Sequence, residues 1–265
     1  MDMTLLAFAL GALIGLILAF TGAGGGVLSI PLLVFGLHLS VQQAAPVGLI
    51  AVGCAAAVGA GLGLREGIVR YRAAVLIGAW GMLLAPLGVW LAPRVSDRPL
   101  MAAFAMILAY SAWRALHTSP PSRTNRVACM VRTQDGRLSW NWLCALALSG
   151  TGMFSGLLSG LLGVGGGFVI IPSLLRHTDL DIRSIQVTSL AVIALVSVSG
   201  VAAASAQGSL SWPVALPFAG GAVLSLLGGR QLAHRVKPAR LQQAFAWICI
   251  VVAVMMLLRA SRGLF

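Results

Sequence analysis

The sequence predicts an all-α polytopic membrane protein that consists of two inverted repeats. Three observations predict this fold class: an apolar composition, a glycine pattern that occurs twice, and basic residues that gather in a few segments. Each repeat is expected to contain a glycine-tipped broken-helix hairpin followed by three transmembrane helices, a plan that is common among transporters.

Composition defines the class of protein. Of the 265 residues, 59% are hydrophobic and 9% are charged, with a mean hydropathy of +0.96. A multispanning helical membrane protein has this composition, whereas a soluble domain of this length does not. The net charge of +12 would suggest nucleic acid for a soluble protein, but here it indicates basic loops that fix orientation in the bilayer.

A shift of 141 residues aligns the first half of the chain with the second over most of its length. The cluster Gly22-Ala23-Gly24-Gly25-Gly26 then meets Gly163-Val164-Gly165-Gly166-Gly167, and Pro31 meets Pro172. Other glycines keep the same register, in the pairs Gly11/Gly152, Gly15/Gly156, Gly59/Gly200, Gly67/Gly208 and Gly88/Gly229. Chance similarity between apolar segments would not preserve this register, so we infer an internal duplication.

Each half contains four apolar stretches. They cover residues 4–37, 41–64, 73–92 and 99–116, and then 141–175, 184–206, 213–234 and 240–259. The last three of each half match the ~20 residues of a spanning helix, whereas the first is too long for one span and is divided by glycines. We predict a first repeat over 1–116, a basic linker over 117–140 and a second repeat over 141–265.

The basic residues distinguish two paths for the long first stretch. If it crosses the membrane once, the two faces hold 10 and 8 basic residues, which is almost no bias. If it is a hairpin, 14 basic residues lie in the segments 64–72, 114–139, 176–183 and 230–240 on one face and 4 on the other. The positive-inside rule favours the hairpin, with the linker 117–140 in the cytoplasm and both termini outside.

The two glycine tips are predicted to bind an anion through the backbone. Glycine permits positive φ, and a helix that restarts after the cluster points its free N–H groups back at the tip. The expected binding residues are Gly24, Gly25, Gly26, Gly165, Gly166 and Gly167. Close helix packing by small residues is the alternative, and it fits Gly11, Gly15, Gly152 and Gly156 well.

Polar side chains near the tips are the next candidates for substrate binding. Gln186, Thr188 and Ser189 begin the span after the second hairpin, while Thr21, Ser155 and Ser159 precede the clusters. Each hydroxyl could instead bond to a helix carbonyl. Thr188 and Ser189 align with Val47 and Gly48, so the predicted site is asymmetric.

Other chemistry is weakly represented in the sequence. The acidic residues fall near predicted loops, so no buried carboxylate points to ion coupling. The four cysteines have no CxxC spacing and are interpreted as small apolar residues. His177, Asp179 and Asp181 resemble a loose metal cluster, but a mixed-charge exit loop is the preferred interpretation. No metal, cofactor or catalytic residue is expected.

The phrase GVGGGFVIIP at 163–172, the segment QVTSL at 186–190 and the turn GSLSW at 208–212 resemble the sulfite exporter TauE/SafE family of permeases. The resemblance covers both halves and nearly the whole chain. It implies a plasma-membrane transporter of sulfur-containing anions such as sulfite or sulfonates, including sulfoacetate.

The predicted function is therefore a permease that moves a small sulfur-containing anion by alternating access. An anion channel, or a permease for another small carboxylate or inorganic anion, is the alternative. A membrane enzyme would need clustered His, Asp or Cys in the spans, and the sequence has no such cluster. The expected partners are a small anionic substrate and the lipid bilayer, with a homodimer as an open alternative and no nucleic acid.

Overall fold

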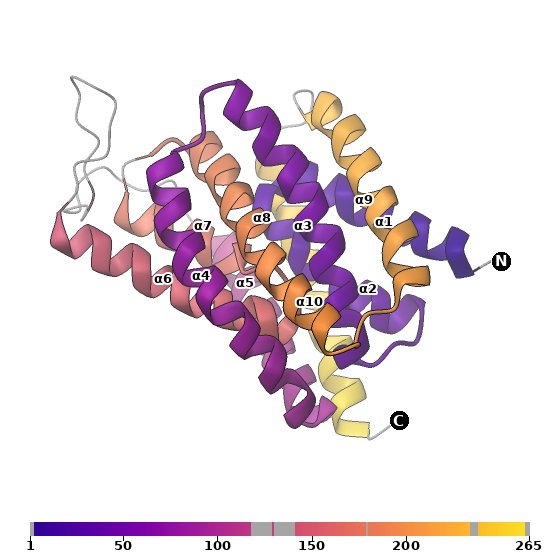
Figure 1. Cartoon of the computed structure of the whole chain (residues 1–265). Helices are drawn as coiled ribbons and strands as arrows, with labels where there is room; N and C mark the ends of the chain where they lie inside the picture. Colours follow the sequence, from indigo (N-terminus) through magenta and orange to yellow (C-terminus); the bar gives the residue numbers. More distant parts are fainter. Residues whose placement is uncertain (1–2, 118–128, 130–140, 179, 234–237, 263–265) are drawn as a thin grey trace.

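The described residues form α-helices and two short 3₁₀ helices, η1 and η2 (Figure 1). The computed structural model describes residues 3–117, 129, 141–178, 180–233 and 238–262. The first half contains α1 (Met3–Thr21), η1 (Gly22–Leu28), α2 (Ser29–Gly36), α3 (Val41–Arg65), α4 (Tyr71–Leu91), η2 (Ala92–Arg94) and α5 (Asp97–His117). The second half contains α6 (Trp142–Leu162), α7 (Gly167–His177), α8 (Ile182–Ala206), α9 (Trp212–Ala233) and α10 (Pro238–Arg262).

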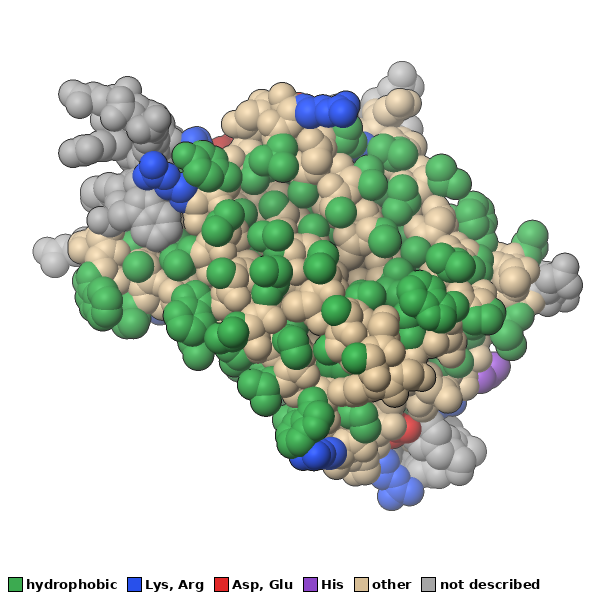
Figure 2. Space-filling model, viewed as in Figure 1, with side chains coloured by type: hydrophobic (Ala, Val, Ile, Leu, Met, Phe, Trp, Pro, Cys, Tyr) green, Lys and Arg blue, Asp and Glu red, His purple; other side chains and the backbone are tan. Residues whose placement is uncertain are grey.

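Six helices within the described residues are long and apolar enough to cross a membrane, namely α1, α3, α4, α6, α8 and α9. Large apolar side chains also cover the outside of the molecule, and Figure 2 shows them across the whole visible face. Trp142 is 75% exposed, and Leu216 and Trp247 are each 62% exposed. Such a surface is expected against lipid and not against water. The prediction of an all-α polytopic membrane protein is confirmed.

The helices of the two halves have matching bounds. A shift of 141 residues carries Val41–Arg65, which is α3, onto Ile182–Ala206, which is α8. The same shift carries the end of α1 onto the end of α6 and the starts of α4 and α5 onto those of α9 and α10. The register of the glycines in the sequence is therefore also a register of secondary structure.

Glycines bring helices of different halves into close contact. α1 packs mainly on α9, where Gly11 touches the Phe218 carbonyl and Gly15 touches the Ala222 carbonyl. The shifted pairs recur where α6 packs on α4, as Gly152 against Ile77 and Gly156 against Gly81. These glycines therefore serve close helix packing, the alternative role that the sequence analysis gave them. Because α1 and α6, the first helices of the two hairpins, each pack on the other half, neither half encloses its own hairpin.

Loops that are distant in sequence meet at one end of the molecule, which we call the linker end. The Glu66 carboxylate, after α3, pairs with Arg183 of α8 at 3.3 Å and with Arg230 of α9 at 2.9 Å. At the opposite, distal end, the Gln42 amide donates to the Val95 carbonyl at 2.9 Å. The hairpin path requires the segments 64–72, 176–183 and 230–240 to share one end, and their described parts do so.

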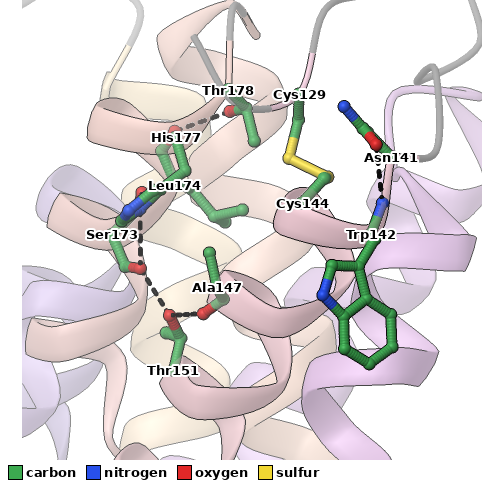
Figure 3. Close-up of a disulfide and its surroundings, with 10 residues drawn as sticks. All are labelled: Cys129, Asn141, Trp142, Cys144, Ala147, Thr151, Ser173, Leu174, His177 and Thr178. Carbon is green, nitrogen blue, oxygen red and sulfur yellow. Dashed lines mark hydrogen bonds between the residues drawn. A yellow bond between two sulfur atoms is a disulfide. The ribbon is translucent and has the colours of Figure 1, made fainter.

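Cys129 and Cys144 form a disulfide, so the interpretation of these two cysteines as small apolar residues is wrong (Figure 3). Their separation of 15 residues matches no motif that the sequence could have revealed. The Cys129 N–H donates to the His177 carbonyl of α7 at 2.9 Å. This hydrogen bond and the disulfide to Cys144 of α6 together tie the linker residue Cys129 to both helices of the second hairpin. Apart from Cys129 and His117, the predicted linker lies outside the described residues.

Replacing Gly15 by Ala should destabilise the fold, because the new methyl group would overlap the Ala222 carbonyl. Overpacking of this kind costs about 1–3 kcal/mol in free energy of unfolding, and a rigid backbone neighbour favours the upper value. A thermal unfolding curve of the detergent-solubilised protein measures the effect. Gly220→Ala is the control, since a methyl group there meets nothing within 4 Å and should leave stability unchanged or slightly raised.

Candidate functional site

The two glycine tips meet between α3 and α8. A methyl group on Gly26 of the first tip would lie 3.0 Å from the Val164 carbonyl of the second. The Val52 side chain of α3 lies against both tips, 3.0 Å from that position on Gly26 and 3.3 Å from the equivalent position on Gly165. Both interruptions of the helices are thus enclosed by protein, as non-helical backbone in a membrane must be.

The two tips have different backbones. Gly22 and Gly163 are related by the 141-residue shift and share a φ of +68°. After Gly22 the first cluster continues as the 3₁₀ helix η1, whereas in the second cluster Gly165 and Gly166 also have positive φ, +77° and +69°. Residues that carry a side chain rarely adopt these backbone angles, so glycine is needed at both positions.

The second tip also leaves backbone donors unpaired. Among the described residues, the N–H groups of Val164, Gly165 and Gly166 have no hydrogen-bond partner. All three residues are buried, and α7 begins directly after them at Gly167. Buried N–H groups are almost always paired, so three adjacent ones at a helix start suit an anionic ligand.

Hydroxyl groups surround the tips, and within the described residues no buried side chain is charged. Ser29 donates to the Gly26 carbonyl at 2.7 Å and was missed by the sequence analysis, although it lies only three residues after the last glycine of the cluster. Ser159, one turn before Gly163, and Ser197, beside Gly53, have buried hydroxyl oxygens without a partner. Ser197 was also missed, because nothing in the sequence distinguishes it from the other serines of α8.

The side chains predicted to contact substrate are spread along α8. The Thr188 hydroxyl accepts a hydrogen bond from the Arg70 N–H at 3.1 Å, which ties α8 to the start of α4. Ser189 donates to the Gln186 carbonyl at 2.8 Å within its own helix, which is the alternative role considered for such hydroxyls. The Gln186 side chain packs on Gly22 and donates to the Thr21 carbonyl at 3.5 Å, so it lies at the first tip.

A cavity of about 370 Å³ opens at the distal end. Its polar lining comes mainly from Gln42, Gln43, Gln207, Ser209 and Ser211. At its inner limit it reaches Gly160 and Ala45, and Ala45 touches Gly163 of the second tip. The cavity therefore leads from the distal surface to the second tip.

Among the described residues, no three His, Cys, Asp or Glu side chains gather. His177 instead donates from Nδ1 to the Ser173 carbonyl at 2.9 Å, and Ser173 shares a hydrogen bond with Thr151 (Figure 3). Asp179, the second member of the loose cluster noted in the sequence, lies outside the described residues. This network joins α6 to α7 and stiffens the second hairpin.

Comparison with known proteins identifies a family for this chain. A family model described as sulfite exporter TauE/SafE matches residues 7–256. A probable membrane transporter protein of Xylella fastidiosa is 25% identical over 261 residues, covering 96% of this chain and 95% of the relative. Another, from Methanocaldococcus jannaschii, is 24% identical over 262 residues, covering 94% and 93%. Solved structures give no significant match.

Replacing Thr188 by Val should lower the free energy of unfolding by about 1 kcal/mol, because the Arg70 N–H loses its acceptor. Thr188→Ser keeps the hydroxyl and should restore most of that stability. Thermal unfolding of the purified variants measures the difference. Ser189→Ala is the matched control, since its hydroxyl bonds only within α8, and a loss equal to that of Thr188→Val would contradict the assigned role.

Proposed function

This chain belongs to the sulfite exporter TauE/SafE family, and from that premise we propose that it carries a small sulfur-containing anion by alternating access. Sulfite, and sulfonates such as sulfoacetate, are the proposed substrates. The chain is a membrane transporter, in agreement with its family, its relatives and the six long apolar helices among its described residues. The choice of anion and the alternating mechanism are the parts proposed here.

The second tip is the observation that carries the proposal. Its three unpaired N–H groups lie at the start of α7, with the unpaired Ser159 hydroxyl one turn before Gly163. Neutral donors of this kind stabilise an oxyanion in a low-dielectric interior without a permanent buried charge that would need its own partner. Gly165 and Gly166 carry two of these N–H groups and are therefore proposed as the primary binding residues, together with Gly167, which follows them as the first residue of α7.

The first tip is proposed to complete the site from the opposite side. Gly26 lies against Val164, and Gly24 and Gly25 precede it in η1. The amides of a 3₁₀ helix are largely used within that helix, so its contribution to an anion is its dipole and its close approach. Gln186 at this tip is the proposed side-chain donor, with Thr188 and Ser189 on the following turn of α8.

The distal cavity is the proposed route by which the anion reaches the tips. Its lining of amides and hydroxyls contains no carboxylate that would repel an anion. A matching route at the linker end would require the two halves to exchange roles, which is the usual mechanism of inverted repeats. The equal spacing of the helices in the two halves supports that arrangement.

The linker end is proposed to face the cytoplasm, with both termini on the outer side. Fourteen of the 18 basic residues belong to the segments 64–72, 114–139, 176–183 and 230–240. A bias of this size is the usual determinant of orientation in the plasma membrane. Arg65 and Arg70 lie at this end, where their charge would attract anions as well as fix orientation.

An anion channel with the same tips is the alternative function, as is a permease for another small carboxylate or inorganic anion. Transport into proteoliposomes separates these possibilities when sulfite, sulfoacetate, thiosulfate and small carboxylates are compared. Saturable uptake with counterflow is expected for at least one sulfur-containing anion. Uptake without counterflow would indicate a channel, and uptake of carboxylates alone would overturn the proposed substrate.

Gly166→Ala should reduce uptake at least about tenfold, because its methyl group would lie 2.7 Å from the Ser155 carbonyl at a φ of +69° and displace the unpaired amides. Gly25→Ala should also reduce uptake, since its methyl group would lie 2.7 Å from the Leu18 nitrogen. Initial rates in proteoliposomes, divided by the amount of inserted protein, measure both effects.

Gly150→Ala in the same second hairpin is the control for these glycines, because a methyl group there meets nothing within 4 Å. Its uptake should equal that of the unchanged protein. If both Gly25→Ala and Gly166→Ala keep the full uptake rate, the proposal that the glycine tips bind the anion is wrong.

If the linker end faces the cytoplasm, Cys129 and Cys144 should be thiols in living cells and form their disulfide only after oxidation. Denaturation of cells in acid, alkylation without reductant and mass spectrometry should then find all 4 cysteines alkylated. A Cys144→Ser variant calibrates the count. Alkylation of Cys54 and Cys249 alone would place the linker end in an oxidising compartment and reverse the orientation.

A further inference from the structure

The loop that joins α3 to α4 is tied to the start of α8 at the linker end. Three contacts make this connection. Glu66 forms an ion pair with Arg183 at 3.3 Å. The Ser184 hydroxyl donates to the Ile68 carbonyl at 2.8 Å, and the Arg70 N–H donates to the Thr188 hydroxyl at 3.1 Å. Together they hold α3 and α8 closed at the linker end, directly outside the two tips.

Arg230 of α9 adds a third element to this closure. Its guanidinium pairs with Glu66 at 2.9 Å and also donates to the Gly59 carbonyl of α3 at 3.4 Å. Beneath these charges, the Gln186 side chain fills the space against Gly22. One carboxylate therefore connects α3, α8 and α9 across the boundary between the two halves.

At the distal end, the positions equivalent to the three charged residues and to Gln186 carry different, uncharged residues. The 141-residue shift relates Arg183, Glu66 and Arg230 to Gln42, Gln207 and Val89, and Gln186 to Ala45. Between segments 42–47 and 207–211, both fully described, no hydrogen bond or ion pair occurs. All four of these distal residues line the cavity instead.

We propose that Glu66, Arg183 and Arg230 form a gate that closes the linker end while the cavity is open at the distal end. This inference rests on the proposed alternating-access function and adds the residues that control it. Opening requires Glu66 to release both arginines, and the distal end then closes by bringing Gln42 and Gln207 together across the cavity.

The exposure of the gate suits a contact that must break in each transport cycle. The side chains of Arg183, Glu66 and Arg230 are 54%, 40% and 24% exposed. Ion pairs that water reaches are weak, because solvent screens the attraction and hydrates the separated charges. The gate therefore biases the closed state without locking it, and removal of one charge shifts the balance between two populated states.

Two single-cysteine reporters test the gate in lipid nanodiscs, where both ends of the protein are accessible. Leu49→Cys lies in the distal cavity, and Leu190→Cys is its counterpart behind the gate. Cys54 and Cys249 are replaced by Ala, the Cys129–Cys144 disulfide is retained, and the background without a reporter gives the baseline. The measurement is the rate of reaction with a small, hydrophilic and uncharged maleimide in the absence of any substrate, so that a change of local charge does not itself alter the rate.

With Glu66 present, Leu49→Cys should react and Leu190→Cys should react much more slowly. Glu66→Gln should raise the rate at Leu190→Cys by about threefold or more and lower the rate at Leu49→Cys. Arg183→Gln, an exposed position that does not threaten folding, should shift both rates in the same directions by a smaller factor. Opposite changes at the two ends are a signature that mere loosening of the structure cannot produce.

Arg65→Gln is the matched control, because it removes a charge from the same end without breaking either ion pair with Glu66, and both rates should stay unchanged. The gate is refuted if Glu66→Gln leaves both rates unchanged or raises both together. Because no substrate is present, this outcome is independent of the uptake assays. Opposite rate changes together with failed anion uptake would keep the gate and reject the proposed substrate.

Discussion

Backbone polar groups that lie in a bilayer must be paired or enclosed by protein, and the whole arrangement depends on this constraint. Two glycine clusters interrupt helices in the interior of the molecule, so both need protein or a polar cavity around them. α3 and α8 provide most of that enclosure and are accordingly the most buried of the six long apolar helices in the described part of the chain, with 67% and 56% of their most apolar 18-residue stretches buried. The tips meet between them, where Val52 lies against Gly26 and Gly165.

Close glycine contacts place each hairpin against the opposite half and so hold the tips in position. α1 is fixed by α9 and α6 by α4, through contacts that leave no room for a methyl group at Gly15 or Gly156. Without a hydrophobic driving force between helices in lipid, such close backbone approach is the main source of specific packing. A shift of either pair along its axis would therefore move a tip, and the packing far from the site determines its geometry.

The sequence predicted the features that depend on periodicity and glycine register, since these are properties of the backbone. The helix bounds, the interruption at Gly22 and Gly163, and the packing role of Gly11 and Gly152 are features of this kind. It could not predict side-chain partners, because Thr188 meets Arg70 across 118 residues and Ser197 meets Gly53 only in the folded chain. The disulfide was missed for the same reason, as its 15-residue spacing has no recognisable pattern. The sequence also could not predict that the two tips differ in backbone conformation, because the two glycine clusters differ at only one residue.

The repeat preserves backbone positions while the chemistry at those positions has diverged. Thr151 and Ser173, which join the second hairpin, correspond to Leu10 and Leu32 in the first, and the second hairpin alone among the described residues carries a disulfide. Two identical halves would give two states of equal energy, so a resting state requires such differences between equivalent residues. The charges at the linker end and the open cavity at the distal end are differences of this kind. If the protein works by the proposed alternating access, divergence within the duplication sets which end is open at rest, while the shared glycines give both halves the same helix packing.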